Sequence, residues 1–296
     1  MPTRCGFVAV IGRPNVGKST LINAIMGTKI SIVTHKPQTT RHRILAVHTD
    51  GDTQIVFVDT PGIHRKAAKA MNRLMNRTAV NALADADLVL FVVEATHWTD
   101  EDDDIVNRLR ATETPVVAVL NKVDRVHPKE RLLEAIATLS NRHQFAEIFP
   151  ISALKKDNLD ALMAVIPKFL PESPQLFPQE MQTDRSAEFQ AAEVIREKLM
   201  LMLHQEVPYG LTVQIESYES DDERLTISAI IWVARDSQKG IVVGKGGKVL
   251  KTVGQSARLE LREKLDCRVH LELWVKVKDN WSDNERDLMR LGYESP

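Results

Sequence analysis

The sequence predicts an α/β domain with a mostly parallel sheet, followed by an α+β domain. In residues 1–170, short apolar runs rich in β-branched residues alternate with helical segments, which is typical of a parallel sheet. In residues 185–296, a helix, two alternating strands, a second helix and a final alternating strand predict the α+β domain. Residues 171–184 between them are rich in proline, which indicates a linker.

The composition is that of a soluble globular protein. Of the 296 residues, 43% are hydrophobic and 27% are charged. No stretch approaches the roughly 20 apolar residues of a membrane span, and Met1 runs almost directly into the first strand, so we expect no signal peptide and a cytosolic protein. Cys5 and Cys267 show no pairing or metal-binding pattern. The net charge is −1 and neither part of the chain is basic overall, so a nucleic-acid surface would have to be a local patch.

The first domain is organised around a glycine-rich loop. Residues 7–11 predict a strand and residues 20–26 a helix, so the loop between them leads to a helix N-terminus. Unpaired N–H groups and the helix dipole favour a phosphate there. Lys18 would reach the outer phosphates and the Ser19 hydroxyl would hold Mg²⁺. The nucleotide-binding residues predicted in this loop are Gly12, Arg13, Pro14, Asn15, Val16, Gly17, Lys18, Ser19 and Thr20.

Residues 31–41 show no regular pattern and contain a proline, which indicates a loop that a bound nucleotide could order. Thr39 and Thr40 are its candidate Mg²⁺ ligands, although two threonines before a strand also fit β-propensity alone. Residues 44–49 and 54–58 then alternate around a hairpin turn.

The second strand of this hairpin ends in Asp59-Thr60-Pro61-Gly62. An aspartate at the carboxyl end of a strand beside the phosphate loop can bind Mg²⁺ through water. Gly62 can turn its N–H to the terminal phosphate. A strand followed by a Pro-Gly turn is common on its own; its place in the chain, after Lys18, favours the functional interpretation.

Two further strands follow, at residues 88–93 and 115–120, after a helix predicted over residues 67–83. The acidic run at residues 100–104 lacks the alternating ligands and glycine of a calcium loop. It is therefore interpreted as the N-terminus of a helix, where negative charge complements the dipole. A closing helix is predicted over residues 159–169.

The strand at residues 115–120 ends in Asn121-Lys122-Val123-Asp124. The Asp124 carboxylate can accept hydrogen bonds from N1–H and the 2-amino group of guanine, Asn121 can contact the other edge, and the Lys122 stem can pack over the ring. Adenine lacks that donor pair, so the motif predicts a guanine nucleotide. Ser152 and Ala153, after the last strand, are expected beside O6 of the base.

The second domain begins with a helix capped at residues 184–186 and continues with strands over 211–218 and 225–234 around the turn Ser220-Asp221-Asp222. A Gly-x-x-Gly loop then precedes a helix over 248–265 and a strand over 268–278. Such a loop can bring its backbone against a nucleic-acid backbone. The ring of Trp274 would stack on bases, although that strand face could equally be an ordinary solvated face. The residues predicted to contact RNA are Lys239, Gly244, Lys245, Gly246, Gly247, Lys248, Lys251, Trp274, Lys276 and Lys278.

Several motifs occur together over nearly the whole chain: Gly-Arg-Pro-Asn-Val-Gly-Lys-Ser-Thr, Gln-Thr-Thr-Arg-His-Arg, Asp-Thr-Pro-Gly, Asn-Lys-Val-Asp, Ile-Ser-Ala, the glycine-rich loop and Leu-Glu-Leu-Trp-Val-Lys-Val-Lys. In this combination the chain resembles the Era family of ribosome-associated GTPases. The resemblance implies a P-loop GTPase domain followed by a type II KH domain. It also implies a short helix over residues 238–243, where propensity alone predicts a strand.

The resemblance implies hydrolysis of GTP to GDP and phosphate, served by Asn15, Lys18, Thr40 and Gly62. Of the two threonines it favours Thr40, so that Ser19, Thr40 and Asp59 hold Mg²⁺. Asn15 is the implied ligand of a K⁺ ion that acts as a transition-state charge. The family lacks the glutamine with which many GTPases orient water, in agreement with Ile63.

The resemblance also implies the partners. The KH domain of such proteins binds single-stranded RNA near the 3′ end of small-subunit ribosomal RNA and supports maturation of the small ribosomal subunit. The protein is expected to be a cytoplasmic monomer. Loose contact with the inner membrane rests on the resemblance alone, because no basic amphipathic helix predicts it.

Two other functions compete with GTP hydrolysis. An RNA-binding assembly factor could hold GTP with little turnover, because Ile63 cannot make the hydrogen bond that orients the attacking water. An ATP-dependent phosphotransferase would require adenine in the base pocket, which Asp124 opposes.

Overall fold

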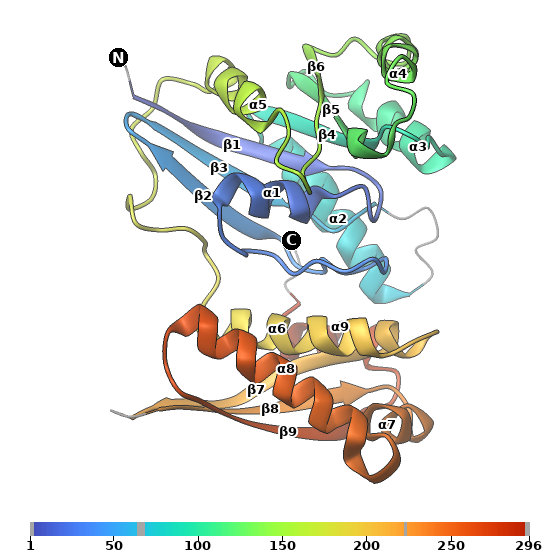
Figure 1. The fold of residues 1–296 in the computed structure, drawn as a ribbon, viewed down its shortest axis with the longest axis vertical. Helices are drawn as coiled ribbons and strands as arrows, with labels where there is room; N and C mark the ends of the chain where they lie inside the picture. The colour runs from blue at the N-terminus through green and yellow to red at the C-terminus, as the bar shows by residue number, and fades with distance from the viewer. Residues whose placement is uncertain (1–2, 64–68, 222–223, 294–296) are drawn as a thin grey trace. The chain divides into compact units, whose positions relative to one another are not determined.

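A six-stranded sheet is the centre of the first part of the chain (Figure 1). Its strand order is β2-β3-β1-β4-β5-β6, and every neighbouring pair is parallel except β2 with β3. The predicted mostly parallel sheet is therefore confirmed. The strands are β1 (Arg4–Ile11), β2 (Ile44–Asp50), β3 (Thr53–Asp59), β4 (Leu88–Glu94), β5 (Val116–Asn121) and β6 (Glu147–Pro150). The computed structural model describes residues 3–63, 69–221 and 224–293.

Helices cover both faces of this sheet because its central strands are apolar on both sides. Val8 and Leu90 pack with Leu21 and Leu162 in one core, whereas Phe91 packs in a second core on the opposite face. The helices are α1 (Lys18–Met26), α2 (Ala70–Ala84), α3 (Asp100–Leu109), α4 (Arg131–Ser140) and α5 (Leu159–Val165), with 3₁₀ turns η1 (Val123–Arg125) and η2 (Ile166–Phe169).

The predicted helices of this part have three different outcomes. The helix predicted over 67–83 begins at Ala70, and residues 67 and 68 lie outside the described residues. The acidic run does open a helix: Thr99 caps α3 and Asp102 closes a capping box. The single helix predicted over 159–169 is wrong, because α5 ends at Val165 and η2 forms the last four residues around Pro167.

The stretch interpreted as a linker makes specific contacts with the strands. The buried Gln54 side chain accepts the N–H groups of Leu176 and Phe177, both at 2.9 Å. Further along, Val47 N–H donates to the carbonyl of Gln182 at 3.0 Å. By its contacts the chain divides into two units, the first reaching Asp184 and the second starting at Arg185, except that Lys69–Met71 group with the second.

The second unit is a three-stranded sheet with helices on one face. Its order is β7-β8-β9, with β7 and β8 antiparallel and β8 and β9 parallel. Its core consists of apolar residues from the strands, α6 and α8. Asp222 of the predicted hairpin turn lies outside the described residues. The elements are α6 (Ala187–Met202), η3 (Val207–Gly210), β7 (Leu211–Ser220), β8 (Leu225–Val233), α7 (Asp236–Val243), η4 (Lys245–Gly247), α8 (Lys248–Leu265), β9 (Val269–Val277), η5 (Trp281–Asp283) and α9 (Glu285–Arg290).

Residues 236–243 form a helix, as the resemblance implies and against the strand that local propensity predicts. The β-branched run at its end does not decide the structure, because Val242 is fully buried in the core of this unit. Among the described residues, no helix is both long enough and apolar enough to cross a bilayer.

Candidate functional site

The glycine-rich loop lies between β1 and α1, at the carboxyl ends of the parallel strands. The Lys18 ammonium donates to the carbonyls of Gly12 and Arg13, both at 3.0 Å. Its side chain is buried, and this burial lowers the pKa of Lys18 to about 8, although the nearby Asp59 carboxylate acts in the opposite direction. A lysine so placed gains charge stabilisation when phosphate oxygens arrive.

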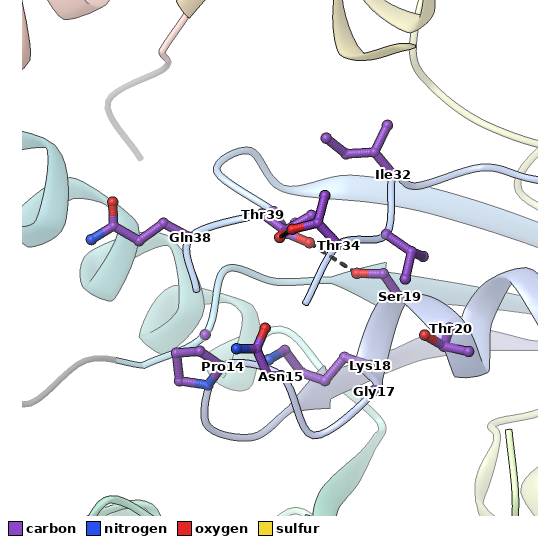
Figure 2. A pocket seen from close by; sticks show the side chains of 13 residues that line it. Pro14, Asn15, Gly17, Lys18, Ser19, Thr20, Ile32, Thr34, Gln38 and Thr39 are labelled. Atoms are coloured by element: carbon purple, nitrogen blue, oxygen red, sulfur yellow. Dashed lines mark hydrogen bonds between the residues drawn. The ribbon is translucent and has the colours of Figure 1, made fainter. Parts of the chain in front are cut away.

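Pro14, Asn15 and Lys18 line one side of a pocket whose other side carries Thr34 and Thr39 (Figure 2). The pocket therefore lies between the phosphate loop and the irregular loop over residues 31–41. Asn15 has a φ of 65° and donates from its side-chain amide to the carbonyl of His35 at 3.0 Å. The two loops are thus joined directly.

Three side-chain oxygens meet beside Lys18. The Ser19 hydroxyl lies 2.9 Å from the Thr40 hydroxyl and 2.9 Å from a carboxylate oxygen of Asp59. Thr39, the other candidate ligand, instead contacts the hydroxyl of Thr34 at 2.6 Å. Of the two threonines, Thr40 is therefore the one beside Ser19.

These oxygens fit a hard divalent cation. Asp59 is fully buried, and its Oδ1 has no hydrogen-bond partner in the part of the chain that the structure describes. Burial raises the pKa of this carboxyl, since the charged form is separated from water. A cation at this position would compensate the buried charge, and carboxylate and hydroxyl oxygens are ligands that suit Mg²⁺.

The segment after β3 lies against the phosphate loop. A Cβ on Gly62 would lie 2.8 Å from the backbone nitrogen of Pro14, so only glycine fits at this distance. Thr60 donates to the carbonyl of Val10 at 2.9 Å. Pro61 is buried and Ile63 is also buried, in the core on one face of the sheet.

The last residue of β5, Asn121, contacts the phosphate loop after β1 and the loop after β6. The Asn121 amide nitrogen donates to the carbonyl of Val16 at 2.8 Å, and its oxygen accepts the N–H of Ala153 at 3.0 Å. The Ser152 hydroxyl donates to Asp124 at 2.6 Å, and this hydrogen bond lowers the pKa of Asp124 and so favours its ionised form. An ionised carboxylate at this position is an acceptor for two N–H donors of a base.

The residues predicted to bind RNA fall into two groups that the structure does not bring together. Lys239, Lys245, Lys248 and Lys251 lie around the loop between α7 and α8. Trp274, which is 43% exposed, instead lies on the face of β9 opposite the leucines that pack toward α8.

The remaining two lysines of the prediction have acidic partners. Lys276 lies 3.7 Å from Glu216, and Lys278 lies 2.7 Å from Asp287 of α9. Of the predicted residues, those at the Gly-x-x-Gly loop therefore form the more coherent surface for a phosphate backbone.

Sequence reasoning missed a cluster of arginines at the other end of α8. Arg258 and Arg262 of α8 line a hollow of about 440 Å³. Helical spacing could have revealed them, because Lys248, Lys251, Arg258 and Arg262 fall on one face of the helix. The arginine surface comprises Arg224, Arg258, Arg262 and Arg268, with Val269 and His270.

A phosphate loop joined to an Asn-Lys-x-Asp loop on a mostly parallel sheet, followed by a Gly-x-x-Gly α+β unit, defines the class: a P-loop GTPase that carries a KH domain. The chain matches the family model described as 50S ribosome-binding GTPase over residues 7–122 and the KH domain model over residues 206–282.

GTPase Era of Actinobacillus pleuropneumoniae serotype 3 (strain JL03) is 50% identical over 292 residues, which cover 98% of this chain and 96% of that protein. GTPase Era of Yersinia pestis (strain Pestoides F) is 49% identical over 292 residues, which again cover 98% of this chain and 96% of that protein. Era in complex with MgGDPNP and nucleotides 1506–1542 of 16S ribosomal RNA has a TM-score of 0.95 at 41% identity, covering 98% of this chain and 99% of that one. An Aquifex aeolicus Era variant bound to GDP·AlF4⁻ has a TM-score of 0.94 at the same identity and coverage. The chain belongs to the Era family of GTPases.

Proposed function

We propose that this GTPase binds small-subunit ribosomal RNA through its KH domain, in support of small-subunit maturation, and that its nucleotide state controls that binding. One observation carries the proposal: the likeness, over 98% of the chain, to an Era structure in complex with MgGDPNP and a 16S ribosomal RNA segment. The proposed domains are a GTPase domain over 1–170, a linker over 171–184 and a KH domain over 185–296. The proposed location is the cytoplasm, with peripheral contact at the inner membrane.

The proposed reaction is in-line attack of water on the γ-phosphorus of GTP, with cleavage of the bond to the oxygen that bridges to the β-phosphate. Lys18 would stabilise charge on the phosphate oxygens, and the Gly62 N–H would donate to the γ-phosphate. Ser19, Thr40 and Asp59 would hold Mg²⁺, which supplies positive charge to the phosphates when bound. The two contacts of 2.9 Å that join their oxygens support this assignment.

The proposed base pocket consists of Asn121, Lys122, Asp124, Ser152 and Ala153. Its support is the hydrogen bond from Ser152 that favours the ionised form of Asp124, and the contacts of Asn121 with the phosphate loop and the loop after β6. Asp124 would accept the N1–H and 2-amino hydrogens of guanine, and adenine offers no such pair of donors.

The proposed RNA surface starts at residues 244–247, whose backbone would approach the RNA backbone. Lysines on either side, at 239, 245, 248 and 251, would neutralise phosphates. The arginine surface at the far end of α8 would extend this contact, because Arg258 and Arg262 share one helix face with Lys248 and Lys251.

A second candidate function is an RNA-binding factor that holds GTP with little turnover. The buried Ile63 favours it, since this side chain cannot orient a water molecule. Phosphate release separates the two candidates: a GTPase releases phosphate over many turnovers, and a holding factor releases less than one equivalent.

The deciding experiment measures phosphate release with and without an RNA that ends in the 3′ segment of 16S ribosomal RNA. We expect RNA to raise the hydrolysis rate of the full-length chain. A Lys245→Glu/Lys248→Glu variant should lose RNA binding and this stimulation, yet keep basal turnover. Equal rates with and without RNA would refute the coupling, and undiminished RNA binding by the variant would refute the KH assignment.

A further inference from the structure

A single carboxylate lies between the phosphate loop and the proposed base pocket. Because β4 lies between β1 and β5 in the sheet, its last residue, Glu94, emerges between the two loops that follow those strands. Its Oε2 is 2.8 Å from the Lys122 ammonium and 3.4 Å from a guanidinium nitrogen of Arg13. One side chain thus contacts a cation from each loop.

Arg13 is fixed on its other side by helix α3. Its Nε donates to Asp102 at 3.0 Å, and another nitrogen donates to the carbonyl of His97 at 3.1 Å. Asp102 is fully buried and is also the residue that closes the capping box with Thr99. Arg13 therefore cannot move toward Lys122 without breaking contacts at the start of α3.

The charges around Glu94 favour its ionised form. Its side chain is only 14% exposed, and this burial by itself would raise the carboxyl pKa. The hydrogen bond and charge of Lys122, with the charges of Arg13 and Arg125, outweigh burial and lower the pKa of Glu94. Removal of this carboxylate would leave Lys122 and Arg13 as two neighbouring cations with less compensation.

We propose that Glu94 is a positioning residue: it holds Lys122 in place beside the guanine ring and so sets how long the nucleotide stays bound. This inference rests on the proposed base pocket, in which the Lys122 stem packs over the ring. A free lysine loses rotamer freedom when it packs on a ligand, whereas a lysine already held by Glu94 loses less. This smaller entropy loss is the same for bound GTP and for the transition state. It therefore strengthens nucleotide binding and does not change the rate of the chemical step.

The test replaces Glu94 by glutamine, which has the same shape without the charge. We expect Glu94→Gln to raise the dissociation rate of a fluorescent GDP roughly tenfold and to raise KM for GTP with kcat unchanged. The matched control is Asp103→Asn in α3. This substitution also removes one negative charge, and it breaks an ion pair of 2.8 Å with Arg142. This control should dissociate GDP at the wild-type rate.

A double variant separates positioning from general loosening. If Glu94 acts through Lys122, Glu94→Gln/Lys122→Met should release GDP no faster than Lys122→Met alone. A wild-type dissociation rate in Glu94→Gln, a fall in kcat, or single effects that multiply in the double variant would each overturn the inference. Asp124→Asn distinguishes failure of the pocket: if that variant keeps its guanine preference, the proposed pocket itself is wrong. If it loses the preference while Glu94→Gln behaves as wild type, only the role of Glu94 is wrong.

Discussion

The side-chain amide of Asn121 donates a hydrogen bond of 2.8 Å to the backbone carbonyl of Val16. This contact joins the end of β5 to the phosphate loop after β1, although 105 residues separate the two positions in the sequence. The oxygen of the same amide accepts from Ala153 in the loop after β6. One side chain therefore links the proposed phosphate site to the loops of the proposed base pocket.

This contact predicts that Gly17→Ala damages the protein. Gly17 has a φ of 103°, and a Cβ there would lie 2.4 Å from the amide nitrogen of Asn121. We expect a loss of about 2–3 kcal/mol in the free energy of unfolding, measured in urea, together with loss of GDP binding.

Gly27→Ala is the matched control for that variant. Gly27 also has a positive φ, 68°, but no atom lies within 4 Å of the position that a Cβ would take. It should lose only about 1 kcal/mol from backbone strain and bind GDP normally. If the two variants lose equal stability and bind GDP equally, the Asn121 contact does not set the loop geometry.

The base pocket predicts a change of specificity in Asp124→Asn. An asparagine offers a donor where guanine also has one, whereas xanthine offers an acceptor. Because two hydrogen bonds to a charged group disappear, GTP should bind roughly a hundredfold more weakly and XTP should bind better than GTP. Competition between fluorescent GDP and each nucleotide measures both affinities, and retained guanine preference would refute the assignment of Asp124.

The sheet could be predicted from the sequence because its strands carry their own signal. Residues 88–93 are apolar at every position, and the structure buries all of them between two layers of helices. Short local motifs could be predicted for a similar reason. A turn, a capping aspartate or a Gly-x-x-Gly loop depends on only a few consecutive residues. Asp102 is an example, since its capping box with Thr99 lies within one helical turn.

Contacts between distant elements could not be predicted in the same way. The sequence places Lys278 among the RNA contacts, but its partner Asp287 belongs to α9, a helix with no sequence prediction. Trp274 and the loop lysines fall on different faces because of how β9 packs against α8, which alternation alone does not specify. Glu94 gave no sequence signal either, since its importance follows from the position of β4 between β1 and β5.

Potassium dependence tests the role of Asn15. Its amide nitrogen contacts His35, so the oxygen of the same amide is the atom that could ligate a cation. Wild-type GTP hydrolysis should be roughly tenfold faster in KCl than in NaCl at equal ionic strength. Asn15→Gly, which tolerates the local φ of 65°, should remove this difference between the two salts. Equal rates of the wild type in the two salts would contradict the role of Asn15.

The buried Lys18 predicts a pH dependence of nucleotide affinity. Burial lowers its pKa to about 8 in the free protein, and phosphate oxygens would favour the charged form in the complex. Below that pH the ammonium is already charged, so affinity is constant. Above it, binding must take up a proton, so GDP affinity falls as the pH rises.

Calorimetry in two buffers of different ionisation enthalpy measures this proton uptake. Uptake should be near zero at about pH 7 and approach one proton at about pH 9, once the contribution of the free nucleotide is subtracted. Lys168→Met, which removes a lysine outside the pocket, should behave as wild type. The same uptake at both pH values would show that Lys18 does not titrate on binding.

The arginine surface predicts a longer RNA footprint than the Gly-x-x-Gly loop alone provides. Lys248 and Arg262 lie near opposite ends of α8, about 21 Å apart at a rise of about 1.5 Å per residue. A KH loop clamps about four nucleotides, so only an RNA that extends beyond them reaches the far end of this helix. Arg258→Glu/Arg262→Glu should therefore weaken binding of an RNA of about 12 nucleotides roughly tenfold, and leave binding of an RNA of about four nucleotides unchanged.

The salt dependence of binding gives an independent measure of the same surface. The slope of log K against log salt is negative, and its magnitude falls by about 0.7 for each single-strand phosphate that the protein no longer neutralises. The double variant, which loses two such contacts, should therefore reduce the magnitude of the slope by about 1.4. Arg286→Glu/Arg290→Glu changes the same number of charges on exposed positions of α9 and is the matched control. If it weakens RNA binding as much as Arg258→Glu/Arg262→Glu, the effect comes from net charge. If only Arg258→Glu/Arg262→Glu weakens binding, and only for the longer RNA, the arginine surface contacts the phosphates beyond the first four nucleotides.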